Sequence, residues 1–272
     1  MRVSVTGFAK VVSVIIGIAA TSGAMAQGRD PARDFGCARP LRIAVMEFGA
    51  MYHDGAGVDA DIIGELMWRS GCLFEIREIE RADIWSAIEA DTIDMATSSI
   101  ATPGREKLAR FVTYFGIKNM LVLPIAEVGT TFSLDALVAK PTWRIGLVRG
   151  FRYGNYYDYQ LKSLLGDDRM VEFATQEDLF QALRRAQVEA ILTPSIHYFF
   201  YLTEEELDAF TLVNASPAPP TPSGLAFSRA TFNAAQVDNW LRLIEGMRLD
   251  RTLHRFAERH IPKAAAATMI EY

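Results

Sequence analysis

The sequence predicts an α/β protein built from two lobes, and three observations support this prediction. Apolar strand-like segments alternate with amphipathic helical segments, which is typical of βαβ units around a mainly parallel sheet. The order strand–helix–strand–helix–strand occurs twice, over residues 41–97 and again over 144–192. A proline-rich segment at 215–224 separates the second run from a further strand and a long helical tail. We therefore infer two lobes.

Residues 1–26 have the features of a secretory signal peptide. Arg2 and Lys10 give a positively charged start, residues 11–20 are apolar, and Ala24-Met25-Ala26 supplies a cleavage site of the A-x-A type. The apolar stretch is too short to cross a bilayer. We expect cleavage after Ala26 and export to the periplasm.

The first run of elements begins with an apolar, β-branched strand at 41–48. A helix follows, for which Asp59 or Asp61 can act as the N-cap and which Gly71 ends. Its apolar positions have the spacing of an amphipathic helix: Ile62, Ile63, Leu66 and Met67. The other predicted elements of this run are a strand at 74–76, a helix at 82–90 and a strand at 93–97.

The second run follows an apolar strand at 120–125. Thr175 is the expected cap of one of its helices. In another helix, at 155–165, the core candidates are Tyr159, Leu161, Leu164 and Leu165. The other predicted elements are strands at 144–148, 170–173, 190–192 and 225–228, a helix at 176–186 and a helical tail at 231–261.

The proline-rich segment cannot form a helix or a central strand, so it suits a connection between the lobes. We expect the chain to leave lobe 1 near 124–130 and to return near 217–224. Lobe 1 then comprises residues 27–125 and 223–272, and lobe 2 comprises residues 126–222.

The chain after the signal peptide has two cysteines, Cys37 and Cys72. In an oxidising compartment the expected state is one disulfide between them. The alternative is two buried free thiols. A redox site is disfavoured, because no C-x-x-C motif is present.

Charge and motifs exclude several function classes. The formal net charge is −5 and no long basic run occurs, so nucleic acid is not an expected partner. The four histidines show no metal spacing and no Ser-His-Asp motif is present, so we expect no metal, no cofactor and no catalytic residue. We expect a monomer.

Several stretches carry a resemblance to a known family. They are LRIAV at 41–45, GVDADIIGELMWRSG at 57–71, IWSAIEADTIDMATSSIATPGREKLARFVTYF at 84–115, WRIGLVRG at 143–150, GLAFSRAT at 224–231 and LIEGMRLDRTLHRFAERHI at 243–261. In order and spacing they resemble the periplasmic solute-binding proteins of ABC importers, of the amino-acid-binding type (bacterial extracellular solute-binding protein family 3). The resemblance implies the type II periplasmic-binding-protein fold, with two crossover strands that form a hinge. It also implies a small solute bound between the lobes and a membrane ABC permease as partner.

The resemblance also implies ligand-binding residues in lobe 1. Arg105 matches the arginine of the family's Thr-Pro-x-Arg turn, which grips a ligand carboxylate, and a guanidinium can hold a carboxylate in two parallel hydrogen bonds. Ser98 and Ser99 match strand-end residues that offer backbone and hydroxyl groups. Thr102 either binds the ligand or only caps a helix that begins at Pro103.

Further candidates lie at two other strand ends. Glu47 could take an ammonium group, and Phe48 or Tyr52 could cover a ligand side chain. In lobe 2, the N–H groups of Gly150, Phe151 and Arg152 precede a helix and could bind an anion.

One position departs from the family pattern. The family usually places an Asp after the last strand of lobe 2, where it binds the α-ammonium, and here this position is Pro194. Either Glu47 supplies the missing charge or the ligand has no ammonium. The expected function is a receptor for a carboxylate-bearing solute, a polar amino acid or a related organic acid. The alternatives are a dehydratase-like enzyme on the same fold and a sensory module that acts through a membrane partner.

Overall fold

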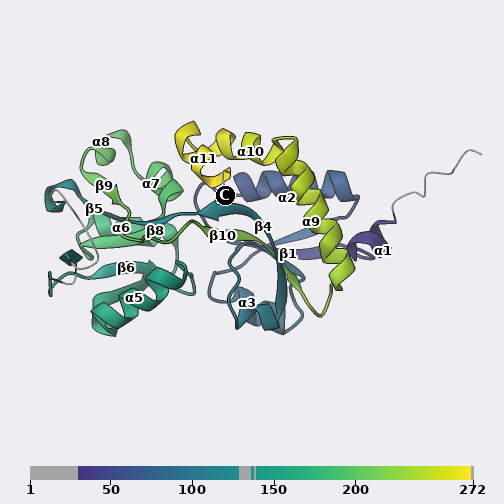
Figure 1. Cartoon of the computed structure of the whole chain (residues 1–272), viewed down its shortest axis with the longest axis horizontal. Coiled ribbons are helices and arrows are strands. Elements are labelled where there is room, and N and C mark those ends of the chain that lie inside the picture. The colour runs from purple at the N-terminus through teal and green to yellow at the C-terminus, as the bar shows by residue number, and fades with distance from the viewer. Residues whose placement is uncertain (1–29, 129–135, 138, 271–272) are drawn as a thin grey trace, which may run out of the picture.

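The computed structural model describes residues 30–128, 136–137 and 139–270. It contains two five-stranded sheets, each covered by helices, and Figure 1 shows them as two bodies joined by the strands β4 and β10. The prediction of two α/β lobes is confirmed. The predicted signal peptide at 1–26 lies outside the described residues.

The first sheet has the order β2-β1-β3-β10-β4. Strand β1 is parallel to β2 and β3, whereas β10 is antiparallel to β3 and β4, so the sheet is mixed and not mainly parallel. Its strands are β1 (Leu41–Val45), β2 (Phe74–Glu78), β3 (Met95–Ser99), β4 (Ala109–Ile117) and β10 (Thr221–Ser228). The accompanying helices are α1 (Pro31–Phe35), α2 (Val58–Ser70), α3 (Ile84–Glu89), η1 (Arg105–Lys107), α9 (Ala234–Leu249), α10 (Thr252–His260) and α11 (Lys263–Ile270).

The second sheet has the order β7-β6-β8-β5-β9 and is also mixed. Strand β6 is parallel to β7 and β8, and β5 is antiparallel to β8 and β9. The strands are β5 (Asn119–Pro124), β6 (Ile145–Val148), β7 (Met170–Phe173), β8 (Ala190–Pro194) and β9 (Phe210–Val213). The helices are η2 (Ile125–Glu127), α5 (Asn155–Leu165), η3 (Asp167–Arg169), α6 (Gln176–Arg184), α7 (Ser195–Tyr201) and α8 (Glu204–Leu207).

The chain crosses between the sheets earlier than the sequence suggested. The strand expected at 120–125 is β5, whose partners β8 and β9 both lie in the second sheet, so it does not belong with lobe 1. Only Lys118 separates β4 from β5. The chain returns through residues 214–220, between β9 and β10. We place the crossings at these two segments.

Strand β10 begins inside the proline-rich segment, contrary to the expectation for residues 215–224. Its register pairs Pro222 with Gly116 of β4, while its pairing with β3 starts only at Gly224. Proline is tolerated here because the strand has a neighbour on one side only at this point.

Two further local expectations need correction. The N-cap of α2 is Gly57, and Asp59 and Asp61 lie in its first turn, so neither is the cap. Tyr159, expected in the core, is 72% exposed, whereas Leu161 is buried. The side chains of Leu164 and Leu165 lie outside the described part of the structure. Thr175 caps α6 as expected, accepting from the N–H of Asp178.

The predicted disulfide is confirmed. Cys37 and Cys72 are bonded, with their Cα atoms 5.7 Å apart. The bond ties the segment after α1 to the end of α2, and the free-thiol alternative is thereby excluded. Helix α1 itself is anchored by the indole N–H of Trp240 in α9, which donates to the carbonyl oxygen of Phe35.

One buried carboxylate holds together three segments of the first lobe. Both oxygens of Asp94 accept from the guanidinium groups of Arg39 and Arg42 at 2.7–3.0 Å, and from the hydroxyl of Thr231 at 2.8 Å. Burial by itself raises the pKa of Asp94, but the hydrogen bonds from Arg39 and Arg42 outweigh it, so the pKa lies well below its usual value. We call these four residues the Asp94 cluster.

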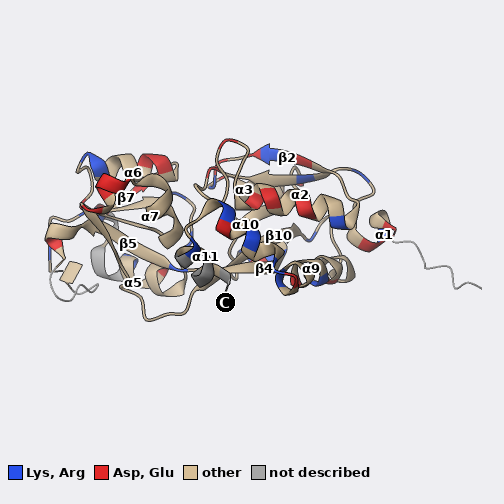
Figure 2. Ribbon diagram, turned by 90° about the horizontal axis from the view of Figure 1, so that it is seen from above, with Lys and Arg blue, Asp and Glu red and all other residues tan. Residues whose placement is uncertain are grey.

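Charges are distributed over the whole molecule. Figure 2 shows basic and acidic residues interspersed on both lobes in this view. In the part of the chain that the structure describes, no helix combines the length and apolar character needed to cross a membrane.

Candidate functional site

Arg105 lies between the two lobes, directly after the turn Thr102-Pro103-Gly104. It is 8% exposed. Its Nη1 donates to the carbonyl oxygen of Ile100 in lobe 1 (3.1 Å), and its Nη2 donates to the carbonyl oxygen of Gly150 in lobe 2 (3.0 Å). The guanidinium also lies over the ring of Trp85, 4.5 Å from the ring centroid. One arginine therefore touches both lobes.

A second arginine, Arg81, lies at the same interface, although no sequence motif marks it. It is 5% exposed, and both Nη atoms donate to the carbonyl oxygen of Ser98 at 3.1 Å. Its guanidinium lies 4.7 Å from the ring centroid of Phe151 in lobe 2 and 5.6 Å from that of Phe48 in lobe 1. Its Nε is buried without a hydrogen-bond partner.

Neither guanidinium donates to a carboxylate of the described residues; their acceptors are carbonyl oxygens and the sulfur of Met46. Burial lowers the pKa of Arg81 to about 10. Burial, followed by repulsion from Arg81, lowers the pKa of Arg105 to about 9. The charges of Asp59 and Asp158 act on Arg81 and Arg105 respectively, but neither carboxylate is hydrogen-bonded to them. Two buried cations without a hydrogen-bonded carboxylate are energetically unfavourable and are the expected partners of an anion.

Aromatic side chains close the space between the lobes around these arginines. The rings of Phe48 and Phe151 lie 5.4 Å apart, and the ring of His197 from α7 meets Phe48 edge-on at 4.4 Å. Gly150 has a φ of +73°, and a Cβ atom there would lie 2.9 Å from the Cα of Ala82 in lobe 1. Glycine is therefore required for this close approach.

Glu47 forms a polar link between the lobes. One oxygen accepts from the hydroxyl of Tyr201 in α7 at 2.8 Å, and the other lies 2.9 Å from Nδ1 of His53. The hydrogen bond to Glu47 raises the pKa of His53. In this state the Glu47 carboxylate, expected to meet an ammonium, is occupied by protein groups.

The end of β3 is held by a buried network. Ser98 has a φ of +45°, its Oγ donates to Asp59 at 2.7 Å, and its N–H donates to the hydroxyl of Tyr114. Tyr114 donates to the other oxygen of Asp59 at 2.5 Å. Burial raises the pKa of Asp59 to about 6 even though these hydrogen bonds lower it. The network fixes the Ser98 carbonyl that Arg81 contacts.

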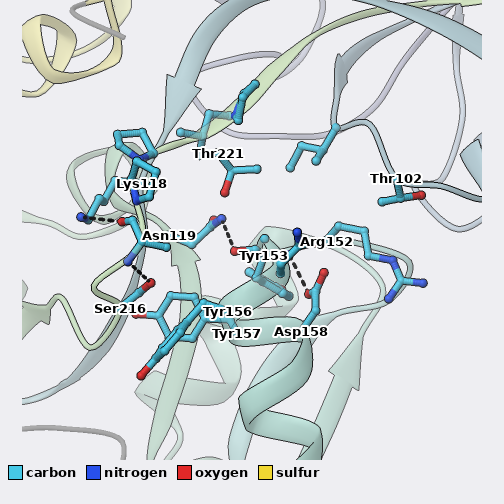
Figure 3. Close-up of a pocket in the computed structure, with 18 of the residues that line it drawn as sticks. Thr102, Lys118, Asn119, Arg152, Tyr153, Tyr156, Tyr157, Asp158, Ser216 and Thr221 are labelled. Atoms are coloured by element: carbon cyan, nitrogen blue, oxygen red, sulfur yellow. Dashed lines mark hydrogen bonds between the residues drawn. The ribbon is translucent and has the colours of Figure 1, made fainter. Parts of the chain in front are cut away.

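Two cavities lie between the lobes. The first, about 320 Å³, borders both crossing segments, and we call it the hinge cavity (Figure 3). Figure 3 shows Thr102 on one wall facing Arg152 and Asp158, with Lys118 and Asn119 at the crossing. The amide of Asn119 donates to the carbonyl oxygen of Tyr153 at 3.1 Å.

The second cavity, about 350 Å³, we call the arginine cavity. Arg81, Glu47 and Phe48 line it from lobe 1, and Phe151 and Gln176 line it from lobe 2. Three of these residues, Phe48, Arg81 and Phe151, also contact one another across the interface between the lobes.

Solved structures resemble this architecture closely. An amino acid ABC transporter substrate-binding protein from Streptococcus pneumoniae, bound to L-arginine, has a TM-score of 0.68 at 16% identity, over 84% of this chain and 95% of that one. An ancestral cationic amino acid solute-binding protein has a TM-score of 0.62 at 18% identity, over 85% and 97%. The VFT2 domain of Bordetella pertussis BvgS has a TM-score of 0.66 at 17% identity, over 84% and 95%.

This chain has the two-lobed fold of the periplasmic binding proteins. No protein-family model matches the chain, and no curated protein matches it in sequence. The first two of these structural neighbours are named as solute- or substrate-binding proteins. Among the described residues, no group of three His, Cys, Asp or Glu side chains could hold a metal ion.

The predicted ligand residues fall into three groups: those at the contact between the lobes, those that border a cavity, and those that contact only lobe 1. Arg105, Phe48, Gly150 and Phe151 meet at the contact between the lobes. Glu47 borders the arginine cavity, whereas Thr102 and Arg152 border the hinge cavity.

The remaining predicted residues make contacts inside lobe 1. The Ser99 hydroxyl donates to the carbonyl oxygen of Thr97, and the carbonyl oxygen of Tyr52 accepts from the N–H of Phe48. The hydroxyl of Thr102 accepts from the N–H of Arg105, so it supports the short helix η1.

Pro194 ends β8 and precedes α7, opposite Asn119 in the strand pairing. Thr193 before it donates to the buried side chain of Gln176 at 3.0 Å. The chain therefore has no acidic side chain at the position where the resemblance leads one to expect an ammonium-binding Asp.

Proposed function

We propose that this protein is a periplasmic receptor that binds a small carboxylate-bearing solute between its lobes and delivers it to an ABC permease. The observation that carries the proposal is Arg105. It is buried between the lobes, no carboxylate of the described residues accepts a hydrogen bond from it, and it donates to one carbonyl oxygen of each lobe. The carbonyl oxygen of Gly150 takes the position that an oxygen of a ligand carboxylate would occupy.

A carboxylate is a better acceptor for this guanidinium than a carbonyl oxygen, because charge-assisted hydrogen bonds are about twice as strong as neutral ones. Binding then replaces the contact between Arg105 and Gly150 with a contact through the ligand. The two crossing segments, at Lys118 and at 214–220, allow the lobes to separate for entry of the solute and to close again. The ligand is bound and released without chemical change.

The first experiment is a thermal-shift screen of the purified protein with amino acids and organic acids. A ligand present at a hundred times its Kd should add about 2.7 kcal/mol to the free energy of unfolding. Arg105→Met should abolish the shift and still fold. Arg149→Gln, which removes an exposed arginine paired with Glu172, is the matched control and should keep it. An unchanged affinity in Arg105→Met would reject Arg105 as the carboxylate-binding residue.

Two measurements test the rest of the proposal. Cells that lack the gene should lose uptake of the radiolabelled ligand, as expected for a receptor of an importer. The bound ligand should be recovered unchanged after prolonged incubation, and appearance of a product would show that the protein is an enzyme.

A further inference from the structure

We propose that the ligand is a dianion, a short dicarboxylate, with one carboxylate on Arg105 and the other on Arg81 at the arginine cavity. This inference rests on the proposed function and specifies its substrate class. The evidence is that two guanidinium groups, those of Arg81 and Arg105, are buried at one interface, whereas a single carboxylate needs only one guanidinium as its partner.

The two arginines have equivalent surroundings. Arg81 donates to the carbonyl oxygen of Ser98 and Arg105 to that of Ile100, two residues further along the same segment. Across the interface they touch consecutive residues of lobe 2: the ring of Phe151 covers Arg81, and Gly150 accepts from Arg105. The two cations therefore contact one short stretch of each lobe, Ser98–Ile100 and Gly150–Phe151.

The arginine cavity contains unused hydrogen-bond donors. The Nε of Arg81 and the Nε2 of Gln176 are both buried without a partner, and both residues line this cavity from opposite lobes. Gln176 is 1% exposed, and its side-chain oxygen is already used by Thr193. Buried polar groups are normally satisfied, so two orphaned donors at one cavity indicate an acceptor-rich partner.

Three glutamates, Glu47, Glu78 and Glu80, also line this cavity, but no acidic residue of the described chain forms an ion pair with Arg81. Glu47 is held by Tyr201 and His53, and Glu78 and Glu80 are exposed. Asp59, whose charge also acts on Arg81, is bound to Tyr114 and Ser98. The hydrogen-bonding capacity of Arg81 is therefore not used by a carboxylate of the described residues, and Pro194 supplies no anion for an ammonium group.

The experiment compares ligands that differ by one charge and little in shape. Binding of L-glutamate against L-glutamine, and of succinate against succinamate, is measured by calorimetry. If the second carboxylate meets Arg81, the diacid of a pair should bind about tenfold to a hundredfold tighter than its monoacid, as a charge-assisted hydrogen bond contributes that much.

Variants assign this preference to Arg81. Arg81→Met keeps an apolar stem between the two aromatic rings and should bring the diacid-to-monoacid ratio close to one, whereas Arg105→Met should weaken both ligands. Gln176→Glu places a negative charge at the same cavity and should lower diacid affinity selectively, which tests the proposal if Arg81→Met does not fold. Arg77→Gln, at an exposed ion pair with Glu75, is the control and should leave the ratio unchanged.

The outcomes separate this inference from the proposed function. Equal or tighter binding of the monoacids, with dependence on Arg105 retained, would overturn the dicarboxylate inference and leave the receptor in place. The absence of binding by every member of both pairs and of the wider panel would reject both. A preference for diacids that persists in both Arg81→Met and Gln176→Glu would assign the second carboxylate to another residue and overturn the proposal.

Discussion

Two clusters of buried charge in this molecule are built in opposite ways. In the Asp94 cluster, two arginines and a hydroxyl surround one fully buried carboxylate, and every partner lies in the first lobe. At the contact between the lobes, Arg81 and Arg105 are buried with carbonyl oxygens and aromatic rings as their partners. The first cluster is complete within the chain, whereas in the second no carboxylate of the described residues accepts a hydrogen bond from either guanidinium.

The difference separates structural charge from functional charge. A buried charge with all its partners contributes to folding, and removal of one member leaves the others uncompensated. A buried cation without a hydrogen-bonded carboxylate is energetically unfavourable, and an anion from outside the chain would complete it. Substitutions in the Asp94 cluster should therefore act mainly on stability, and substitutions at the contact between the lobes mainly on ligand binding.

The largest effect is expected for Asp94→Ala. This change removes the hydrogen bonds of Asp94 to Arg39, Arg42 and Thr231, and it should lower the free energy of unfolding by about 3 kcal/mol, because the arginines that remain are partly solvated. Ligand affinity should stay within twofold, because no member of the cluster borders either cavity. Urea unfolding and calorimetry measure the two quantities. A loss below about 1 kcal/mol would show that the Asp94 cluster is not structural.

The architecture around both clusters could be predicted from the sequence, because strands and helices alternate with clear periodicity and two cysteines suffice for one disulfide. The crossing could not be placed from the sequence. The apolar run at 120–125 would suit either sheet equally well, and only its pairing with β8 and β9 assigns it to the second. The sequence did not predict β4 and β9 for the same reason: the pairing of β4 with β10 and of β9 with β5 makes them strands, and no local pattern reports that pairing.

The candidate site was only partly accessible from sequence. Arg105 belongs to a recognisable turn, and the structure places it between the lobes. Arg81 stands between Glu80 and Ala82 in a polar stretch and has the appearance of an ordinary surface residue. The fold buries it by bringing Phe151, 70 positions away in the chain, over its guanidinium. No local pattern reports such a contact.

A second prediction concerns the support beneath Arg81. The pKa of Asp59 is about 6 in the folded protein and 3.8 without its surroundings, so the folded state favours the protonated form. Asp59 therefore contributes stability at low pH that is lost as the pH rises through about 6. The free energy of unfolding of the wild type, relative to Asp59→Asn, should fall by about 2 kcal/mol between pH 4.5 and 7.5. Parallel pH profiles of the two proteins would contradict this.

The smallest effect on stability, and the sharpest test of the contact between the lobes, is expected for Gly150→Ala. The new Cβ would meet Ala82 across the interface at 2.9 Å, in addition to the strain of a φ of +73°. Gly166→Ala is the matched control, because its φ is +64° and no atom lies within 4 Å of the added Cβ.

Both glycine variants should lose about 1 kcal/mol of folding stability, the usual result of placing alanine at positive φ. Only Gly150→Ala should also increase the radius of gyration in small-angle X-ray scattering and weaken ligand binding, because only there does the methyl group hold the lobes apart. The Asp94 cluster, which lies within one lobe, would be unaffected in both. If the two variants bind ligand equally well, ligand binding does not require the lobes to close on Gly150. The Gly150 carbonyl oxygen, which accepts from Arg105, would then not mark the position of a ligand oxygen.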